Sequence, residues 1–152
     1  MKIAVLMVLA LLAPLHTGGA RASNDPVFGY WLSENERAII EIMPCGEKAC
    51  GNTVWLQEPL NGEGQPKTDS NNTNEKLRGR PLCGIRLISN FQSVNPGAWS
   101  GGSIYSPRDG RTYSASMELR GNDTLELRGY LALPLFGKTQ VWTREDGNRG
   151  GC

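Results

Sequence analysis

The sequence predicts an all-β domain in which about eight antiparallel strands form a meander and close into a small barrel. Several windows of the chain alternate apolar and polar residues with a period of two, as strands with one buried face do. The segments between these windows are short and contain Gly, Pro, Asn or Asp, which tight turns require. Finally, Trp31 in the first window and Arg144 in the last window could contact each other if the first and last strands pair.

The first part of the chain contains five of the predicted strands. Their sequences are "FGYWLS", "AIIEIM", "GNTVWLQ", "GIRLISNF" and "WSGGSIY". Residues 58–80, "EPLNGEGQPKTDSNNTNEKLRGR", break the pattern because they are almost entirely polar. We therefore expect a long loop there, ending in one helical turn near residues 74–78.

The last three predicted strands are "RTYSASMELR", "TLELRGYL" and "KTQVWTR". The turn segments "SPRDG", "RGND" and "LPLFG" precede them in order, which predicts three successive hairpins. Period-two alternation places one set of apolar side chains on a common face of the first two strands: Tyr113, Ala115, Met117, Leu119, Leu125, Leu127 and Leu131. Eight strands of this kind suit a closed barrel or a two-sheet sandwich.

Barrel closure is indicated by the residues of the first and last strands. The segment "QVWTR" places Gln140, Trp142 and Arg144 on one face of the final strand, which pairs with the first strand in a closed meander. The guanidinium of Arg144 could then stack on the indole of Trp31, a contact worth about 0.5–2 kcal/mol. A Trp on a strand is usually plain core, but the matching Arg favours the barrel over the sandwich.

The N-terminus has the order of a secretory signal peptide. Lys2 is followed by an apolar run over residues 3–15 and by small residues up to Ala22, and the run is too short for an ordinary transmembrane helix. We expect cleavage between Ala22 and Ser23, which leaves residues 23–152 as one exported domain. The alternative is an uncleaved anchor. No later segment is apolar enough to span a membrane.

Export would remove the only histidine, His16. Without an imidazole, Ser-His-Asp and Cys-His catalysis and His-ligated zinc are excluded from the mature chain. Lys2 and Arg21 are lost as well, so that 14 of the 16 basic residues remain against 15 acidic ones. A net charge near −1 without a basic run argues against nucleic acid or anionic lipid as the main partner.

Four cysteines remain after export, and three complete pairings are possible. Cys45 and Cys50 flank "GEKA" between two predicted strands, so we pair them across the hairpin. Cys83 and Cys152 are then left, and their bond would fix the Gly-rich tail, contributing about 4 kcal/mol against about 2 for the short link. A zinc site of four thiolates is the alternative, but the C-x2-C spacing is absent. We predict no metal and no cofactor.

Two features could act in a binding site. Arg78 and Arg80 could together grip a carboxylate or phosphate, or they could form ion pairs with Asp69 or Glu75 and hold the long loop to the barrel. Glu41 is the one carboxylate in an apolar strand, whereas a glycosidase needs two facing carboxylates. We predict no catalytic residue.

Four blocks, in this order, carry a family resemblance: "GYWLSENERAIIEIMPCGEKACGNTVWL", "LRGRPLCG", "WSGGSIYSPRDGRTYSASMEL" and "LELRGYLALPLFGKTQVWTR". Over residues 28–144 the chain resembles the bacterial domain-of-unknown-function family 2147. The resemblance implies a small exported protein with a lipocalin-like (calycin-type) barrel, and it carries over no catalytic residues. Leu131 and Ala132 depart from the glycine that the family tends to have after "RGY".

These observations lead to a non-catalytic protein of the bacterial periplasm that binds one small apolar or amphipathic molecule. An eight-stranded barrel is about wide enough for one such ligand. Its apolar part would lie against Trp55 and Tyr113, with Arg78 and Arg80 at the mouth. The alternative is a structural or protein-interaction factor of the cell envelope whose barrel is filled by its own aromatic residues, Trp55, Trp99, Trp142, Tyr105, Tyr113 and Tyr130. A carboxylate-dependent enzyme comes third. The oligomeric state stays open.

Overall fold

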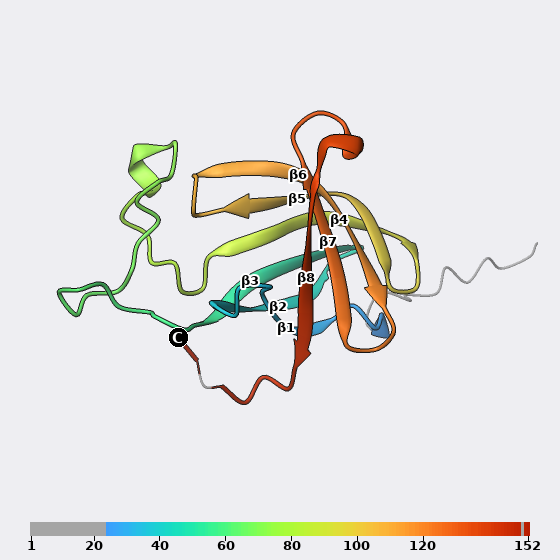
Figure 1. The fold of residues 1–152 in the computed structure, drawn as a ribbon, viewed down its shortest axis with the longest axis horizontal. Coiled ribbons are helices and arrows are strands. Elements are labelled where there is room, and N and C mark those ends of the chain that lie inside the picture. The colour runs from blue at the N-terminus through green and yellow to red at the C-terminus, as the bar shows by residue number, and fades with distance from the viewer. Residues whose placement is uncertain (1–23, 150) are drawn as a thin grey trace, which may run out of the picture.

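A computed structural model describes residues 24–149 and 151–152. Its eight strands form one closed antiparallel barrel in which each strand is hydrogen-bonded to its neighbours in sequence (Figure 1). The predicted fold class, strand number and meander are confirmed. The strands are β1 (Gly29–Leu32), β2 (Ala38–Cys45), β3 (Lys48–Leu56), β4 (Arg86–Asn95), β5 (Ala98–Ser106), β6 (Arg111–Arg120), β7 (Thr124–Tyr130) and β8 (Lys138–Glu145).

Barrel closure depends on β1, which pairs with β2 on one side and with β8 on the other. Trp31 lies opposite Arg144 in the β1–β8 register, and the guanidinium carbon of Arg144 is 4.2 Å from the centre of the Trp31 ring. The same guanidinium donates hydrogen bonds to three backbone carbonyls, those of Pro26, Phe28 and Asn122. A sandwich would leave β1 and β8 unpaired with each other, so this alternative is wrong.

The interior of the barrel is filled by side chains of the chain itself. Its largest fully buried residues are Trp31, Trp99, Trp142 and Phe91, with buried aliphatic residues of β2, β4 and β7 among those around them. A glycine is required at position 102, because a Cβ there would lie 2.1 Å from the ring of Phe91. The barrel therefore has a packed core rather than an open channel around these four rings.

The predicted faces of β6 and β7 are mostly correct. Ala115, Met117, Leu125 and Leu127 are buried in the core, as the alternation predicts. Leu131 is different, because β7 ends at Tyr130 and the Leu131 side chain is 66% exposed. Of the aromatic residues expected inside, Trp99 and Trp142 are fully buried, whereas Trp55, Tyr105, Tyr113 and Tyr130 are only half-buried.

The connections differ between the two ends of the barrel. The longer ones, residues 33–37, 57–85, 107–110 and 131–137, all lie at one end, which we call the loop end. Only the short turns 46–47, 96–97 and 121–123 join strands at the other end. Two 3-10 helices occur within the loop-end connections, η2 (Glu75–Leu77) and η3 (Pro134–Phe136). η2 lies in the region where the sequence predicts a helical turn.

Both predicted disulfides are confirmed. Cys45 and Cys50 bridge the β2–β3 hairpin, and Cys83 and Cys152 join the long loop to the C-terminal tail. The tail is held further by a hydrogen bond of 3.0 Å from the amide of Cys152 to the carbonyl of Val54. Because all four sulfurs are bonded in pairs, the zinc alternative is wrong.

The predicted signal peptide and its cleavage site lie outside the described residues, so both stay predictions. In residues 24–149 and 151–152, no helix has the length and hydropathy that a membrane span requires.

Candidate functional site: a pocket at the loop end

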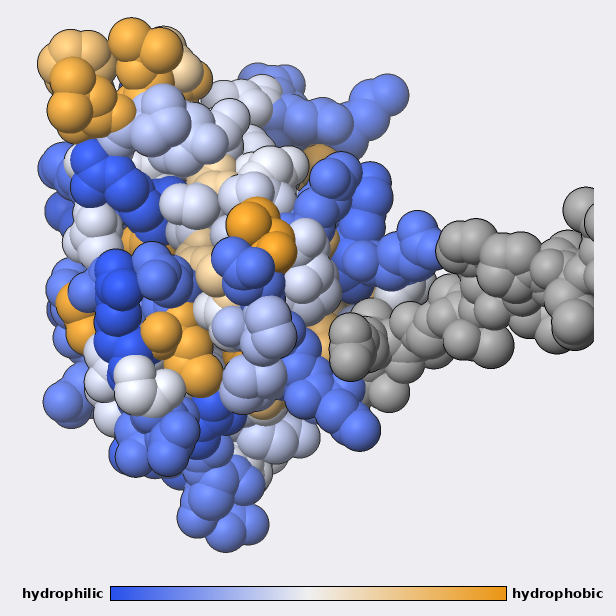
Figure 2. All heavy atoms as spheres, turned by 90° about the vertical axis from the view of Figure 1, so that its right-hand side faces the viewer, coloured by the Kyte–Doolittle hydropathy of each residue, from blue (hydrophilic) through white to orange (hydrophobic). Residues whose placement is uncertain are grey.

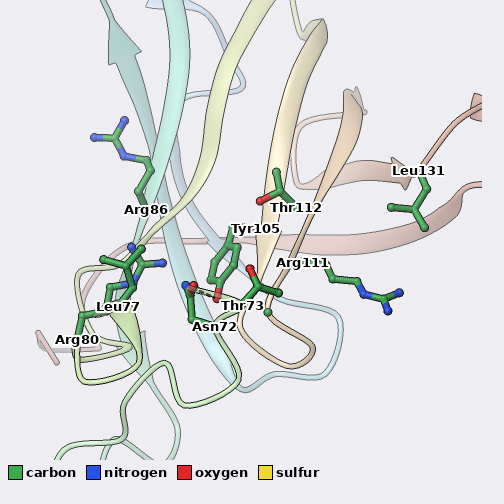
Figure 3. Close-up of a pocket in the computed structure, with 10 residues that line it drawn as sticks. Asn72, Thr73, Leu77, Arg80, Arg86, Tyr105, Arg111, Thr112 and Leu131 are labelled. Atoms are coloured by element: carbon green, nitrogen blue, oxygen red, sulfur yellow. Dashed lines mark hydrogen bonds between the residues drawn. The ribbon is translucent and has the colours of Figure 1, made fainter. Parts of the chain in front are cut away.

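A pocket of about 580 Å³ lies at the loop end of the barrel. Its walls come from the 57–85 connection, from the ends of β4, β5 and β6, and from the start of the β7–β8 connection. Figure 3 shows Tyr105 and Asn72 in its middle, with Arg86 and Leu131 on opposite sides. The lining residues are Asn72, Thr73, Leu77, Arg80, Arg86, Tyr105, Gly110, Arg111, Thr112 and Leu131.

One wall is built around Asp69, whose side chain is completely buried. Nε and Nη2 of Arg80 both lie 2.9 Å from its Oδ2. Tyr105 donates a hydrogen bond of 2.6 Å to Oδ1, and the amide of Asn72 donates one of 2.7 Å to Oδ2. A buried carboxylate is costly unless it is paired and hydrogen-bonded, and these three partners meet that requirement. The network thereby fixes the long loop to β5.

Tyr105 is kept protonated by this environment. Burial raises the pKa of its phenol above the ordinary value, and the hydrogen bond to Asp69 raises it further. The hydroxyl is therefore a hydrogen-bond donor to Asp69 at neutral pH rather than a base. The Arg80 guanidinium also lies over the Tyr105 ring, 5.3 Å from its centre.

Arg78 supports the same loop from outside the pocket lining. Its Nε donates a hydrogen bond of 2.9 Å to the carbonyl of Asn72, and its Nη1 lies 3.2 Å from Oε1 of Glu75. Arg80 pairs with Asp69 and Arg78 with Glu75, which are the contacts of the loop-clamp alternative. Only Arg80 of the two lines the pocket.

The charged residues that line the pocket are all arginines: Arg80, Arg86 and Arg111. No Asp or Glu is among the described lining residues. Arg86 donates a hydrogen bond of 2.6 Å to the neutral side chain of Asn52, and in the described part of the chain only Arg80 of the three is ion-paired with a carboxylate. Leu77 and Leu131 add apolar surface, so the pocket combines positive charge with partly exposed leucines.

The other residues predicted for a ligand site lie elsewhere. Trp55 is near the end of β3, with the guanidinium of Arg149 over its ring at 5.3 Å. Tyr113 donates a hydrogen bond to Asp109. Glu41 lies opposite Tyr30 in the β1–β2 register and raises the pKa of that phenol by its charge. The structure brings none of these residues into the described pocket lining.

Sequence reasoning missed several residues of the pocket: Asn72, Arg86, Tyr105 and Arg111. A signal for three of them was present. Arg86 begins β4, Tyr105 is next to last in β5 and Arg111 begins β6, so all three are at strand ends. In an up-and-down barrel, the end of β5 and the starts of β4 and β6 lie at the same end. Counting strand direction along the meander would have placed them together.

A second pocket, of about 290 Å³, is lined by residues of β4 to β8. It contains Arg120 and Arg128 but also Glu118 and Glu126, and Arg120 is paired with both glutamates. Its charges are thus balanced internally, unlike those of the pocket at the loop end.

Comparisons with known proteins agree with this architecture. A family model described as "Uncharacterized protein conserved in bacteria (DUF2147)" matches residues 29–144, from the start of β1 almost to the end of β8. The chain belongs to this family. A solved structure described as "Protein HP1028 from the human pathogen Helicobacter pylori belongs to the lipocalin family" is also similar. It has a TM-score of 0.68 and 25% sequence identity, and the match covers 79% of this chain and 83% of that chain. No curated protein matches.

The pocket of this DUF2147 protein places three guanidinium groups next to the apolar side chains of two leucines. Guanidinium groups bind carboxylates and phosphates through charge-assisted hydrogen bonds, with planar geometry that an ammonium lacks. The lipocalin-like fold is shown by the closed barrel and the solved relative. The core of this barrel is packed, and the pocket of about 580 Å³ lies outside that core, at the loop end.

Proposed function

We propose that this protein is an exported, non-catalytic barrel of the bacterial periplasm that binds a small amphipathic molecule with an anionic end. The observation that carries the proposal is the pocket at the loop end, whose charged lining residues, within the part of the chain that the structure describes, are the three arginines Arg80, Arg86 and Arg111. Ligand sites typically combine apolar walls with a few polar groups that set orientation. The two leucines and three arginines supply such a combination.

The proposed ligand lies at the mouth rather than along the barrel axis. Trp31, Trp99, Trp142 and Phe91 occupy the interior, and displacing any of them would cost several kcal/mol of packing. The anionic group would lie near Arg111, on the same side of the pocket as Leu131 in Figure 3, because Arg80 is already engaged by Asp69 and Arg86 by Asn52. The short apolar part would lie against Leu77 and Leu131.

Charge selectivity tests this proposal. Sodium decanoate and decyltrimethylammonium bromide share a chain length and differ in the sign of the head group, and calorimetric titration below the micelle concentration compares them. We expect binding of decanoate only. Arg111→Gln should weaken it at least tenfold, since a charge-assisted hydrogen bond contributes about 1.5–3 kcal/mol, and Arg86→Gln, on the other side of the pocket, should weaken it less. Arg120→Gln is the matched control, because Arg120 is about half exposed and lies outside this pocket.

Equal binding of the two probes would contradict the proposal, as would unchanged decanoate binding in both pocket variants. Mass spectrometry of the protein isolated natively from its own cells then identifies the molecule itself. A carboxylic or phosphoric acid carried through purification by the wild type, and lost by Arg111→Gln, is the expected result.

The packed interior supports a second candidate, an interaction factor of the cell envelope. Three fully buried tryptophans and Phe91 leave the centre of the barrel to the protein's own side chains, as such a factor requires. Failure of every anionic probe, together with a native preparation free of small molecules, would favour this function.

A further inference from the structure

The β7–β8 connection exposes an unusual amount of apolar surface. Eight large hydrophobic side chains are exposed in the described chain, and four of them lie within residues 131–136. Their exposed fractions are 66% for Leu131, 58% for Leu133, and 79% for both Leu135 and Phe136. We call these four residues the apolar loop. Isolated exposed leucines need no explanation, but a cluster of this kind marks an interaction surface.

The apolar loop has a defined conformation. Nε of Arg128 donates a hydrogen bond of 2.8 Å to the carbonyl of Pro134, and Nη2 donates one of 3.2 Å to that of Leu135. Backbone hydrogen bonds from Phe136 to Leu133 and from Gly137 to Pro134 close the 3-10 turn of η3. Because the backbone carbonyls are held by Arg128, the loop keeps its apolar side chains in solvent instead of folding them back.

The loop is placed where a flat surface can reach it. Figure 1 shows the β7–β8 connection beyond the ends of the strands, at the upper edge of the molecule. Figure 2 shows a hydrophobic cluster that protrudes at the same upper edge, next to hydrophilic residues. A protruding group of four side chains can enter a bilayer interface without burying the charged surface around it.

We propose that the apolar loop docks this protein on the surface of a lipid bilayer. Charge around the loop supports this occupant: residues 128–140 include Arg128 and Lys138 and contain no Asp or Glu. Arg108 and Arg111 come from the neighbouring β5–β6 connection and the start of β6, against two nearby carboxylates, Asp109 in the same connection and Glu34 beside Val141. Apolar side chains flanked by cations are the pattern of interfacial attachment, in which the cations meet lipid phosphates.

The net charge of the protein is near zero, which limits the electrostatic contribution to docking but does not oppose docking. The overall charge of the mature chain argues against electrostatic binding to anionic lipid as the main interaction. The proposed attachment is instead driven by burial of the apolar loop, with the flanking cations as a smaller contribution. Attachment should therefore be reversible, and it should be stronger on anionic vesicles without requiring them.

Docking would also bring the pocket to the membrane. Leu131 belongs to the apolar loop and to the lining of the pocket at the loop end. An amphipathic molecule could thus pass between bilayer and pocket along continuous apolar surface. Docking itself does not depend on the proposed ligand, so each of the two proposals can fail alone.

Vesicle co-sedimentation tests the docking. Because the barrel and both disulfides lie within residues 24–152, the protein starting at Ser23 is used, which keeps the apolar N-terminal run from binding lipid. The vesicles are pure phosphatidylcholine or a three-to-one mixture of phosphatidylethanolamine and phosphatidylglycerol. We expect both to bind the wild type, the mixture more strongly. The double variant Leu135→Ser, Phe136→Ser should lose at least tenfold in partition coefficient.

Val94→Ser is the matched control, because Val94 is 58% exposed and lies at the end of β4 away from the loop end. It should bind vesicles as the wild type does, and all variants should keep the wild-type melting temperature. Absence of vesicle binding by the wild type, or equal loss in the control, would overturn the proposal. Sedimentation velocity adds an independent check: a wild-type dimer that the double variant disperses would identify the loop as a self-association surface and overturn it too.

Discussion

Arg144 on the last strand lies over the ring of Trp31 on the first, with 4.2 Å between the guanidinium carbon and the ring centre. This contact spans the seam at which β1 and β8 close the barrel. Because the indole of Trp31 is fully buried, one face of the guanidinium is shielded from water. The same Arg144 also ties down the N-terminal segment through the carbonyls of Pro26 and Phe28.

We predict that Trp31→Ala and Arg144→Ala each destabilise the protein and that their effects are less than additive. Each substitution removes the same stacking contact, so a double-mutant cycle should give a coupling of about 0.5–2 kcal/mol. Urea unfolding followed by tryptophan fluorescence measures the four free energies of unfolding. Additive effects would show that the contact contributes nothing to closure.

The loop-clamp role of the two neighbouring arginines gives a second prediction. Arg80→Gln removes the cation from Asp69, which is fully buried, so it should cost about 2–4 kcal/mol after allowance for the partial exposure of Arg80. Arg78→Gln breaks only an exposed ion pair and one hydrogen bond to a carbonyl, and should cost about 1 kcal/mol. Melting temperatures and the rate of proteolysis within residues 58–80 measure both effects.

Asp69→Asn provides the control for this prediction. In the Arg80→Gln background it removes the unpaired buried charge, so the double variant should be more stable than Arg80→Gln alone. Equal losses for Arg78→Gln and Arg80→Gln would contradict the account of Asp69 as the centre of the network.

The features that the sequence predicts correctly have local signals. Period-two alternation and turn residues mark each strand, and a chain of hairpins leaves few topologies. The Trp31–Arg144 pair and the Cys45–Cys50 disulfide then follow from which strands are adjacent, and Cys83 and Cys152, outside the strands, are the two cysteines that are left. Leu131 shows the limit of this reasoning, since the alternation continues through it although β7 has already ended.

The pocket was less predictable, because it is assembled from segments far apart in sequence. Asp69 lies in a polar loop, and nothing in the local sequence predicts that its side chain is completely buried. Its burial depends on Tyr105 and Arg80 together. Trp55 and Tyr113 are predicted to be inward aromatic residues that contact the apolar part of a ligand. The core instead uses Phe91 and Trp31, and this leaves Trp55 beside the C-terminal tail.

The raised pKa of Tyr105 predicts a specific loss of stability in alkali. Because burial and the hydrogen bond to Asp69 hold the phenol proton, the folded state binds it more tightly than the unfolded chain, whose value is 10.0. The stability from this group is complete below pH 10 and is lost as the pH rises through the folded-state pKa. Tyr105→Phe should lower stability at pH 7 by about 1–3 kcal/mol, since Asp69 loses a donor.

Between pH 9 and 11, the free energy of unfolding of Tyr105→Phe should fall less steeply than that of the wild type, because one of the titrating groups is gone. Urea titrations at several pH values give both quantities. An unchanged alkaline slope in Tyr105→Phe would mean that the Tyr105 proton is not linked to folding.

A final prediction compares Trp31 and Trp99, two buried tryptophans that differ in the hydrogen bonding of their indole N–H groups. Nε1 of Trp31 donates a hydrogen bond of 2.8 Å to the carbonyl of Val27, whereas Nε1 of Trp99 is buried without a partner among the described residues. Replacement by Phe removes similar apolar area at both sites. At Trp31 the substitution also removes a hydrogen bond and most of the stacking contact with Arg144. At Trp99 it removes an N–H donor that has no acceptor.

We therefore expect Trp31→Phe to cost about 1–2 kcal/mol more than Trp99→Phe in urea unfolding. Loss of the unpaired N–H should offset part of the cavity left at Trp99, because an unsatisfied buried donor itself costs about 1–3 kcal/mol. The reverse order would show that Trp99 has a partner in solution. A water molecule would then accept its hydrogen bond, in or beside the second pocket, whose lining includes Trp99.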